Sequence, residues 1–431
     1  YLRDISRLII ERNVHGVDID PRAVQIAGLS LWLRAQKSWQ TQRLCPSERP
    51  QIRKSNVVCA EPMPGDRQML EEFLGTLQGE RLEALMRKAW YVPADKKVRA
   101  TPQMAEALTK LVRAVWQEME LAGEAGSLLK IEETLRDAIS IARKESEEKS
   151  PLFRVLDYGL TEPPKEKYVQ VVSSEEQDFF YRAEGLVLVA LGEYAERTEN
   201  GEGYRRRLFV GDVSQGFKFI NLSRKMFDIV LMNPPFGKPS SSSISLLKKQ
   251  YADDWKDIYA AFIKRMQSKL DENGMVGAIT SLLYLYSKQL RELRKNIITK
   301  NALLIIVELG SGVLDDAAVE TALSVFVNNG TPTTNYLDLF NIIQKDSSLL
   351  VACQQKQFTL HNLDFFENIY GWPLCLHMNS NLLHLWKEQE RLEPDLAEVV
   401  AGNHTFDDFR FLRLRNEVSP ESLNKIWFSY E

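Results

Sequence analysis

The sequence has little cysteine, no long hydrophobic run and no excess of basic residues. Its four cysteines are scattered without a Cys-x-x-Cys pair, and its five histidines do not cluster with them at metal-ligand spacing. The pattern excludes a disulfide-stapled scaffold, predicts no metal site and favours a reduced, cytoplasmic compartment. The longest strongly apolar stretch, Leu186 to Leu191, is far shorter than the roughly 20 residues that cross a bilayer. We therefore expect no membrane segment.

The overall charge gives no sign of a polyanionic partner. The formal net charge is −4, whereas proteins that bind nucleic acid usually present a basic face. Any such contact must come from a local patch. With 431 residues, 44% of them hydrophobic and 26% charged, the chain has the composition of a large globular protein.

Strand and helix patterns alternate over much of the chain and predict an α/β fold with a doubly wound, Rossmann-like sheet. Apolar runs predict strands at residues 14–18, 56–60, 207–210, 227–232, 275–280, 303–309 and 322–327. Asp20 and Pro21 are typical of a helix start, as N-cap and first helical residue. Thr101 and Pro102 indicate another helix, because apolar residues follow them at three- and four-residue spacing.

The composition divides the chain into four predicted regions. Residues 1–65 form the first part of the core, and 66–206, rich in Glu, Lys, Arg and Leu, are expected to be a large helical insertion. Residues 207–330 carry the second part of the core. Regularity weakens after Gly330, and 331–431 are interpreted as the start of a second module.

The strongest functional signal is the tetrapeptide Asn233-Pro234-Pro235-Phe236, directly after the apolar strand 227–232. In α/β sheets, chemistry takes place beyond the carboxyl ends of strands. The Asn233 side-chain oxygen and the Pro234 carbonyl could accept the two hydrogens of an amine attached to an aromatic base, and so orient its lone pair. Phe236 could stack on that base after it leaves the duplex.

The phrase Phe227 to Gly237 resembles the catalytic motif of the amino-methyltransferases of restriction and phage-defence systems. Asparagine at position 233 favours adenine within that family. The resemblance implies a Rossmann-like methyltransferase fold, S-adenosylmethionine as cofactor and double-stranded DNA with a flipped adenine as substrate. It extends to the adenine methyltransferases of BREX phage-exclusion systems, which implies possible defence-system protein partners.

A second signal is the segment Gly16-Val17-Asp18-Ile19-Asp20-Pro21, where an acid ends a strand and a helix begins at once. An acid at a strand tip is where nucleotide-type cofactors have their ribose hydroxyls bound. The resemblance assigns that role to Asp18 and places Ile19 against the cofactor's adenine. The glycine-rich loop that precedes this strand in the family has no counterpart here, so we expect the front of the core to be missing.

The resemblance also implies a third acid, which holds the amino group of the cofactor's adenine. Asp212 follows the predicted strand 207–210 and a glycine, in the family's usual form, and is preferred. Glu61 follows the strand 56–60 and stays open as the alternative. Tyr259 and Phe262 are further candidates to line the site. Near the end, Arg410, Arg413 and Arg415 interleave with aromatic residues, as in a target-recognition region or a half-exposed strand.

The leading hypothesis is therefore an adenine-specific DNA methyltransferase that needs no metal. The alternatives are a catalytically inactive DNA-binding remnant and a fused restriction-modification enzyme, although we find no constellation of acids and lysine typical of a nuclease. A nicotinamide-dependent dehydrogenase would require a Gly-x-Gly-x-x-Gly turn and would give no reason for Asn233 to Phe236.

Overall fold

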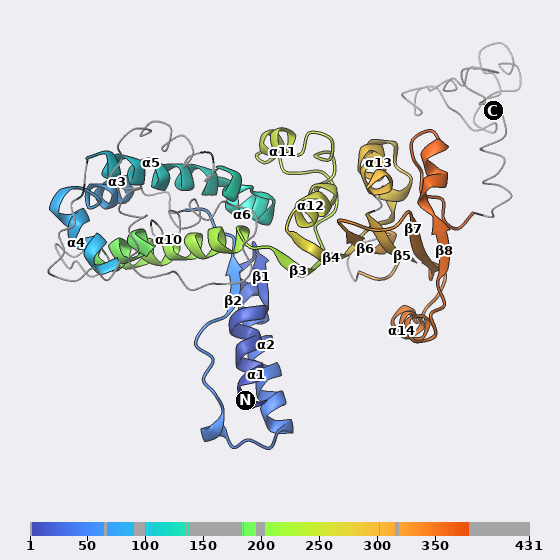
Figure 1. Ribbon diagram of the computed structural model, residues 1–431, viewed down its shortest axis with the longest axis horizontal. Helices are drawn as coiled ribbons and strands as arrows, with labels where there is room; N and C mark the ends of the chain where they lie inside the picture. Colours follow the sequence, from blue (N-terminus) through green and yellow to red (C-terminus); the bar gives the residue numbers. More distant parts are fainter. Residues whose placement is uncertain are drawn as a thin grey trace, which may run out of the picture. The chain divides into compact units, whose positions relative to one another are not determined.

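A computed structural model shows how these patterns fold (Figure 1). The chain divides into two units, Tyr1–His377 and Met378–Glu431. The structure describes residues 2–63, 67–89, 100, 102–134, 137, 183, 185–194, 203–300, 302–314 and 319–378. The predicted recognition segment with Arg410, Arg413 and Arg415 lies outside the described residues.

The first part of the chain is a short parallel sheet with two helices beside it. Strand β1 (His15–Asp18) pairs in parallel with β2 (Asn56–Cys59). As predicted, Asp20 caps the helix that follows: its carboxylate accepts a hydrogen bond of 2.8 Å from the backbone N–H of Arg22. The helices of this region are α1 (Leu2–Leu8), a π-helical turn (Ile9–Asn13), α2 (Pro21–Thr41) and a 3₁₀ turn (Pro46–Glu48).

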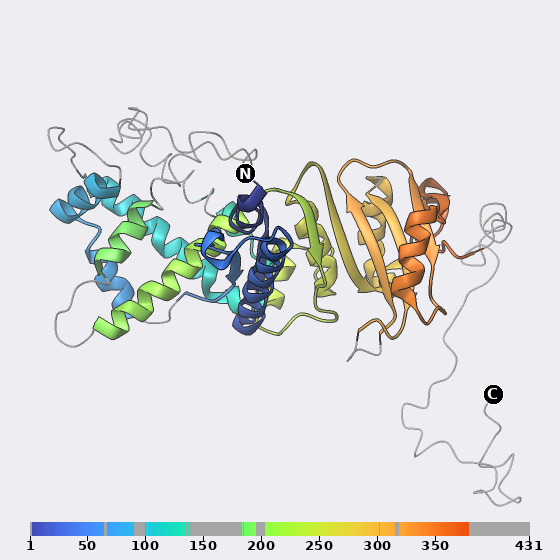
Figure 2. The ribbon, with the colours of Figure 1, turned by 90° about the horizontal axis from the view of Figure 1, so that it is seen from below.

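Helix α1 packs along α2, as Figures 1 and 2 show. The contact centres on Trp39, whose side chain is almost fully buried and whose indole N–H donates a 2.7 Å hydrogen bond to the carbonyl of Arg3. Burial of an aromatic side chain together with its polar atom stabilises such a contact by a few kcal/mol. The strand and helix starts predicted before residue 65 are thus confirmed.

Helices occupy the described residues between β2 and the next strand. The helix predicted at Pro102 is confirmed. The elements are α3 (Arg67–Gly75), α4 (Gly79–Ala89), α5 (Pro102–Glu118), a 3₁₀ turn (Met119–Leu121), α6 (Ala122–Ala125), a 3₁₀ turn (Gly126–Leu128), a helical stretch at residues 185–194 and α10 (Gly203–Ser223).

The strand predicted at residues 207–210 is wrong, because this segment belongs to helix α10. Four apolar side chains face the core at three- and four-residue intervals, the spacing of a helix rather than of a strand: Phe209, Val213, Phe217 and Ile220. The apolar run at 207–210 is only one turn of that longer pattern. Asp212 consequently lies within a helix and not at a strand tip.

The second part of the core is a six-stranded mixed sheet in the order β3-β4-β6-β5-β7-β8. Its strands are β3 (Phe227–Met232), β4 (Leu270–Ser281), β5 (Leu303–Gly310), β6 (Thr321–Val327), β7 (Thr333–Asp338) and β8 (Thr359–Asn362). All four strands predicted between residues 227 and 327 are confirmed. The sheet is separate from β1 and β2, so the expected single sheet is divided in two over the described residues.

Strand directions place the important loops at one edge. β3 is parallel to β4, and β6 runs antiparallel to both β4 and β5, so β3, β4 and β5 point the same way. Their carboxyl ends therefore lie at the same edge of the sheet. Asn233 follows the first of these ends.

Helices lie on both faces of this sheet, although the β3 side chains of Ile229 (68% exposed) and Leu231 (82% exposed) are not covered. Successive strand residues point to opposite faces. Val307 and Leu309 of β5 pack with Leu349 of α14 on one face, whereas Ile306 and Glu308 point to the other. Figure 1 shows α14 and α13 on opposite sides of the strands. The helices are α11 (Ile244–Gln250), α12 (Ile258–Gln267), 3₁₀ turns at Leu282–Leu285 and Lys288–Leu290, α13 (Arg291–Thr299), α14 (Lys345–Gln355) and a 3₁₀ helix (Leu363–Asn368).

Regular structure continues beyond Gly330, contrary to the sequence-based expectation. Strands β7 and β8 complete the sheet, and α14 packs on it. The periodicity of α14 is weak because only Ala352 of its side chains is buried, which explains why the sequence pattern did not reveal it.

A buried charge cluster joins the helical region to α12. The guanidinium of Arg265 donates to Glu132, with a distance of 2.8 Å from Nη2 to Oε2, and to the carbonyls of Ser127 and Leu129. Lys269 pairs with the same carboxylate. Burial and the charge of Arg265 lower the pKa of Lys269 to about 8. We call these three charged residues, Glu132, Arg265 and Lys269, the buried clamp.

Glu132→Gln should destabilise the fold by about 3–5 kcal/mol, because two buried cations lose their counter-ion. The free energy of unfolding in urea measures the change. The neighbouring Glu133→Gln is the matched control: the Glu133 side chain is 52% exposed, and its removal should change stability by no more than about 0.5 kcal/mol. Equal unfolding midpoints for the two variants would show that the clamp contributes nothing.

Candidate functional site

The tetrapeptide predicted to be catalytic lies where β3 ends. Met232 is the last strand residue and pairs with Ala278 of β4. Asn233 is exposed, Pro234 is buried and Phe236 is partly buried. The buried proline holds the backbone in place, since its ring fixes φ, while the asparagine amide stays accessible. The structure thus presents a polar side chain on a rigid turn at the carboxyl edge of the sheet.

Two hydrogen bonds close the loop that follows. The N–H of Gly237 donates to Asp257 Oδ1 over 3.0 Å, and the N–H of Ile258 donates to the Gly237 carbonyl over 2.9 Å. Gly237 has a φ of +97°, which side-chain-bearing residues rarely adopt. Burial raises the pKa of Asp257, although it accepts a backbone N–H. We call this pairing of Gly237 with Asp257 and Ile258 the loop neck.

An aromatic pair packs beneath the surface at the turn after β3. The rings of Phe236 and Tyr259 meet edge to face, with centroids 6.1 Å apart. Tyr259 is 1% exposed, and burial raises the pKa of its hydroxyl. Of the two further candidates, Tyr259 therefore contacts the predicted catalytic segment, whereas Phe262 packs against the hydrophobic core.

The predicted cofactor acid lies at the tip of β1. Asp18 is exposed, and its carboxylate accepts a 2.9 Å hydrogen bond from the N–H of Asp20, which fixes its position. Ile19 beside it is an apolar side chain with 51% exposure. An exposed acid next to an exposed apolar side chain suits a ligand that has hydroxyls and a flat ring.

Glu61 lies near Asp18 at the end of the adjacent strand. β2 pairs with β1 up to Cys59, and the N–H of Ala60 donates to the Asp18 carbonyl over 2.8 Å. Burial raises the pKa of the Cys59 thiol to about 12, and the nearby carboxylates of Glu61 and Asp18 add to the effect. The two acids thus end neighbouring parallel strands.

Asp212 of helix α10 lies close enough to Glu61 to interact with its charge. Burial raises its pKa, and so does the negative charge of Glu61. The strand-tip argument that favoured Asp212 over Glu61 is lost, because α10 is a helix. The geometry expected of the third acid is found at Glu61 instead.

The segment from Ala122 to Glu132 connects the two strand tips. At one end, a Cβ placed on Gly126 would lie 3.0 Å from Ile19 Cγ2, so the backbone of Gly126 contacts the side chain of Ile19. At the other, Glu124 accepts hydrogen bonds from Ser240 and Ser242 in the loop after the catalytic segment. The sequence assigned this segment to an insertion and gave no sign of the role of Glu124. The serine run at 240–243 marked only a loop.

The part of the chain that the structure describes lacks two features. Its His, Cys, Asp and Glu side chains form no group of three or more that could hold a metal ion. Among its helices, none is both long and apolar enough to cross a membrane.

Gly237→Ala should destabilise the protein by about 1–3 kcal/mol, because alanine is strained at a φ of +97°. The urea midpoint measures this cost. Gly211→Ala is the control: Gly211 lies in helix α10 with open space around it, and alanine there should stabilise by about 0.5–1 kcal/mol. Equal changes in the urea midpoint for the two replacements would show that Gly237 is not required for the backbone conformation of the loop neck.

Comparison with known proteins identifies the family of the chain. The family of Eco57I restriction-modification methylases matches residues 12–313, well over half of the chain. The chain is 23% identical over 443 residues to the adenine-specific methyltransferase BrxX of Escherichia coli O9:H4 (strain HS). That alignment covers 99% of this chain, which spans 31% of the length of the relative.

Solved structures of restriction-modification proteins are also similar. One is the Type ISP restriction-modification enzyme LlaGI, solved as a nuclease-deletion mutant in complex with a DNA substrate mimic. Its sequence identity is 14% and its TM-score 0.32, and the match covers 74% of this chain and 40% of that chain. Another is the methyltransferase subunit of a type I restriction-modification system from Streptococcus thermophilus, with 16% sequence identity and a TM-score of 0.29. The match covers 73% of this chain and 80% of that chain. The matched residues include both strand tips, Asp18 and Asn233, and the chain belongs to the Eco57I restriction-modification methylase family.

Proposed function

We propose that the protein methylates the exocyclic amine of adenine in double-stranded DNA, with S-adenosylmethionine as the methyl donor. The observation that carries the proposal is the exposed Asn233 on a turn held by the buried Pro234 and the loop neck. Membership of a methylase family supports the reaction, and the adenine-specific relative supports the base. A DNA substrate also favours action in the cytoplasm, within restriction or phage defence.

The acceptors for the amine are the Asn233 side-chain oxygen and the Pro234 carbonyl. The amine of adenine is a poor nucleophile because its lone pair is delocalised into the ring. Two acceptors that bind its two hydrogens direct the lone pair towards the incoming methyl group, and this orientation supplies much of the rate. As the nitrogen–methyl bond forms, the sulfur–methyl bond would break and the sulfur would leave as a neutral thioether. The nitrogen would then carry a positive charge, and its acidic extra proton would pass to water, so no strong base is needed.

Phe236 is suited to hold the base outside the duplex. Stacking on an aromatic ring contributes roughly 1–3 kcal/mol, which offsets much of an unpairing cost of a few kcal/mol. The edge of Tyr259 keeps the Phe236 ring from moving into the protein. The Phe236 ring is therefore already in position before the base arrives.

The residues at the tips of β1 and β2 fit the adenosine half of S-adenosylmethionine. Asp18 would accept from the ribose hydroxyls, Ile19 would lie against the adenine, and Glu61 would accept from the adenine amine. When bound, S-adenosylmethionine supplies an electrophilic methyl group on a positively charged sulfur. The sequence-based preference for Asp212 is therefore replaced in this proposal by Glu61, with Asp212 as a neighbour that adds negative charge.

Asn233→Ala should reduce the rate of methyl transfer by at least about 100-fold, because one of the two amine acceptors is lost. Transfer of labelled methyl from S-adenosylmethionine to unmethylated DNA measures the rate, and digestion to nucleosides identifies the product. Asn329→Ala, at another exposed asparagine, serves as the control. Unchanged transfer by Asn233→Ala, or no methyladenine from the unaltered protein, would contradict the proposal.

Glu61→Gln should weaken S-adenosylmethionine binding by about 10-fold or more, because a charge-assisted hydrogen bond becomes a neutral one. Asp212→Asn should have a much smaller effect. Isothermal titration calorimetry with S-adenosylmethionine compares the two dissociation constants. The reverse order would return the adenine-binding role to Asp212.

A further inference from the structure

The segment between the two sides of the loop neck carries an unusual number of lysines. Residues 238–256, which we call the lysine loop, begin directly after Gly237 and end directly before Asp257. The loop therefore starts two residues after Phe236. Whatever binds the catalytic segment must pass beside it.

The lysine loop is anchored rather than free. Leu247 of α11 is fully buried, and Tyr251 is 1% exposed and donates a 2.7 Å hydrogen bond to the Leu128 carbonyl. Ser240 donates to Glu124 over 2.8 Å. These contacts and the loop neck hold the lysine loop at both of its ends, at Ser240 and at Tyr251. Its surface residues therefore need little further ordering when a ligand binds.

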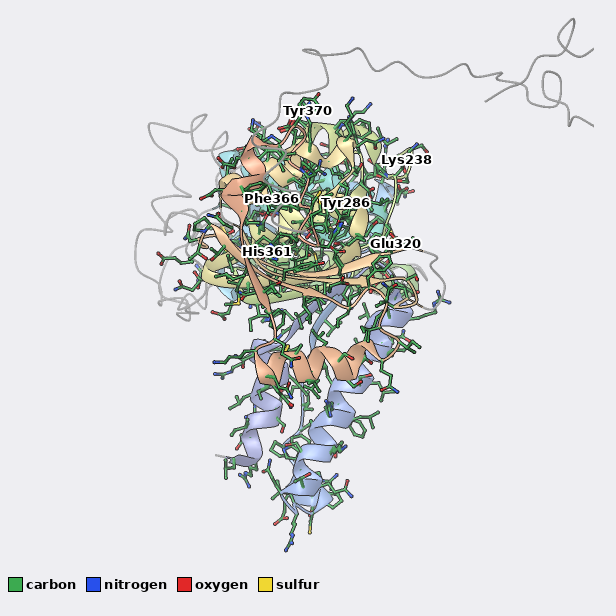
Figure 3. All side chains as sticks on the ribbon, turned by 90° about the vertical axis from the view of Figure 1, so that its right-hand side faces the viewer. Lys238, Tyr286, Glu320, His361, Phe366 and Tyr370 are labelled. Atoms are coloured by element: carbon green, nitrogen blue, oxygen red, sulfur yellow. The ribbon has the colours of Figure 1, made fainter. Side chains whose placement is uncertain are left out.

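Four exposed lysines project from this anchored loop: Lys238, Lys248, Lys249 and Lys256. Figure 3 shows the Lys238 side chain at the outer surface. The ammonium of Lys248 lies 4.5 Å from the centre of the Trp255 ring, which fixes its position on the loop. Lys238 and Lys256 are the chain neighbours of Gly237 and Asp257, which the neck joins.

Little negative charge opposes these lysines. None of the four forms an ion pair with a described residue. Of the two acids in the loop, Asp254 is buried and bound to Lys264 over 3.0 Å, and only Asp253 is exposed. Glu124 accepts from two serines at the side of the loop. The exposed surface of the loop is therefore clearly positive on a chain with net charge −4.

We infer that the lysine loop binds the phosphates of double-stranded DNA beside the flipped base. The inference rests on the proposed function and deepens it. Clustered ammonium groups without counter-ions attract phosphates by releasing condensed cations, and such contacts set orientation rather than sequence. The loop supplies the local basic patch that the overall charge lacks, and the neck ties that patch to Asn233.

The test replaces Lys238, Lys249 and Lys256 with alanine and keeps Lys248, which stacks on Trp255. Binding of a fluorescein-labelled DNA duplex is measured by anisotropy at several salt concentrations. The slope of log K against log salt should become shallower by roughly 3, one for each phosphate that a lysine no longer neutralises. Arginine at the same three positions should keep the slope of the unaltered protein.

The matched control replaces three exposed lysines elsewhere, Lys37, Lys295 and Lys300, and should leave the slope unchanged. Unfolding midpoints check that each variant is folded. Equal slopes for the loop variant and the control would overturn this inference while methyl transfer by the unaltered protein keeps the proposed function. No binding of DNA by the unaltered protein would overturn both.

Discussion

The geometry of the candidate site depends on the buried clamp of Glu132, Arg265 and Lys269. A carboxylate this deeply buried is stable because two cations pair with it, and the guanidinium of Arg265 is itself held by the carbonyls of Ser127 and Leu129. The clamp attaches the segment Ala122–Glu132 to α12, the helix that begins at the loop neck. That segment contacts both Ile19 and the serines after Phe236, so the clamp anchors an element that lies between the two strand tips.

The two halves of the proposed reaction use the same structural device. Each begins where a parallel strand ends, with a residue held by a nearby backbone bond: Asp18 by the N–H of Asp20, and the turn after Asn233 by Asp257. A strand end is rigid on one side and open on the other, which allows a polar side chain to be both fixed and exposed. Groups held in this way need little reorganisation when a ligand binds.

The helical region between β2 and β3 is more than an addition to the core. Gly126 in the middle of this region lies against Ile19, the proposed cofactor contact, and the last described helix, α10, brings Asp212 near Glu61. It also anchors Tyr251 and Ser240 of the lysine loop. The region thus contributes to the proposed cofactor site, the proposed catalytic site and the proposed DNA-binding surface.

The sequence by itself determined the elements whose patterns are local. The apolar strand before Asn233, the Asp20 cap and the proline-rich turn follow from neighbouring residues, and the structure agrees with each. It also marked Asp18 as an acid at a strand tip. Local periodicity failed at residues 207–210, because four residues cannot distinguish a strand from one turn of a helix.

Only the tertiary structure decided what depends on contacts between distant residues. It showed that Glu61 ends the strand beside Asp18, and that Asp257 closes the loop twenty residues after its start. It also showed Glu124 and Arg265 acting across more than a hundred residues. Such contacts leave no periodic trace in the sequence, because each depends on how separate elements pack and on which polar groups that packing must satisfy.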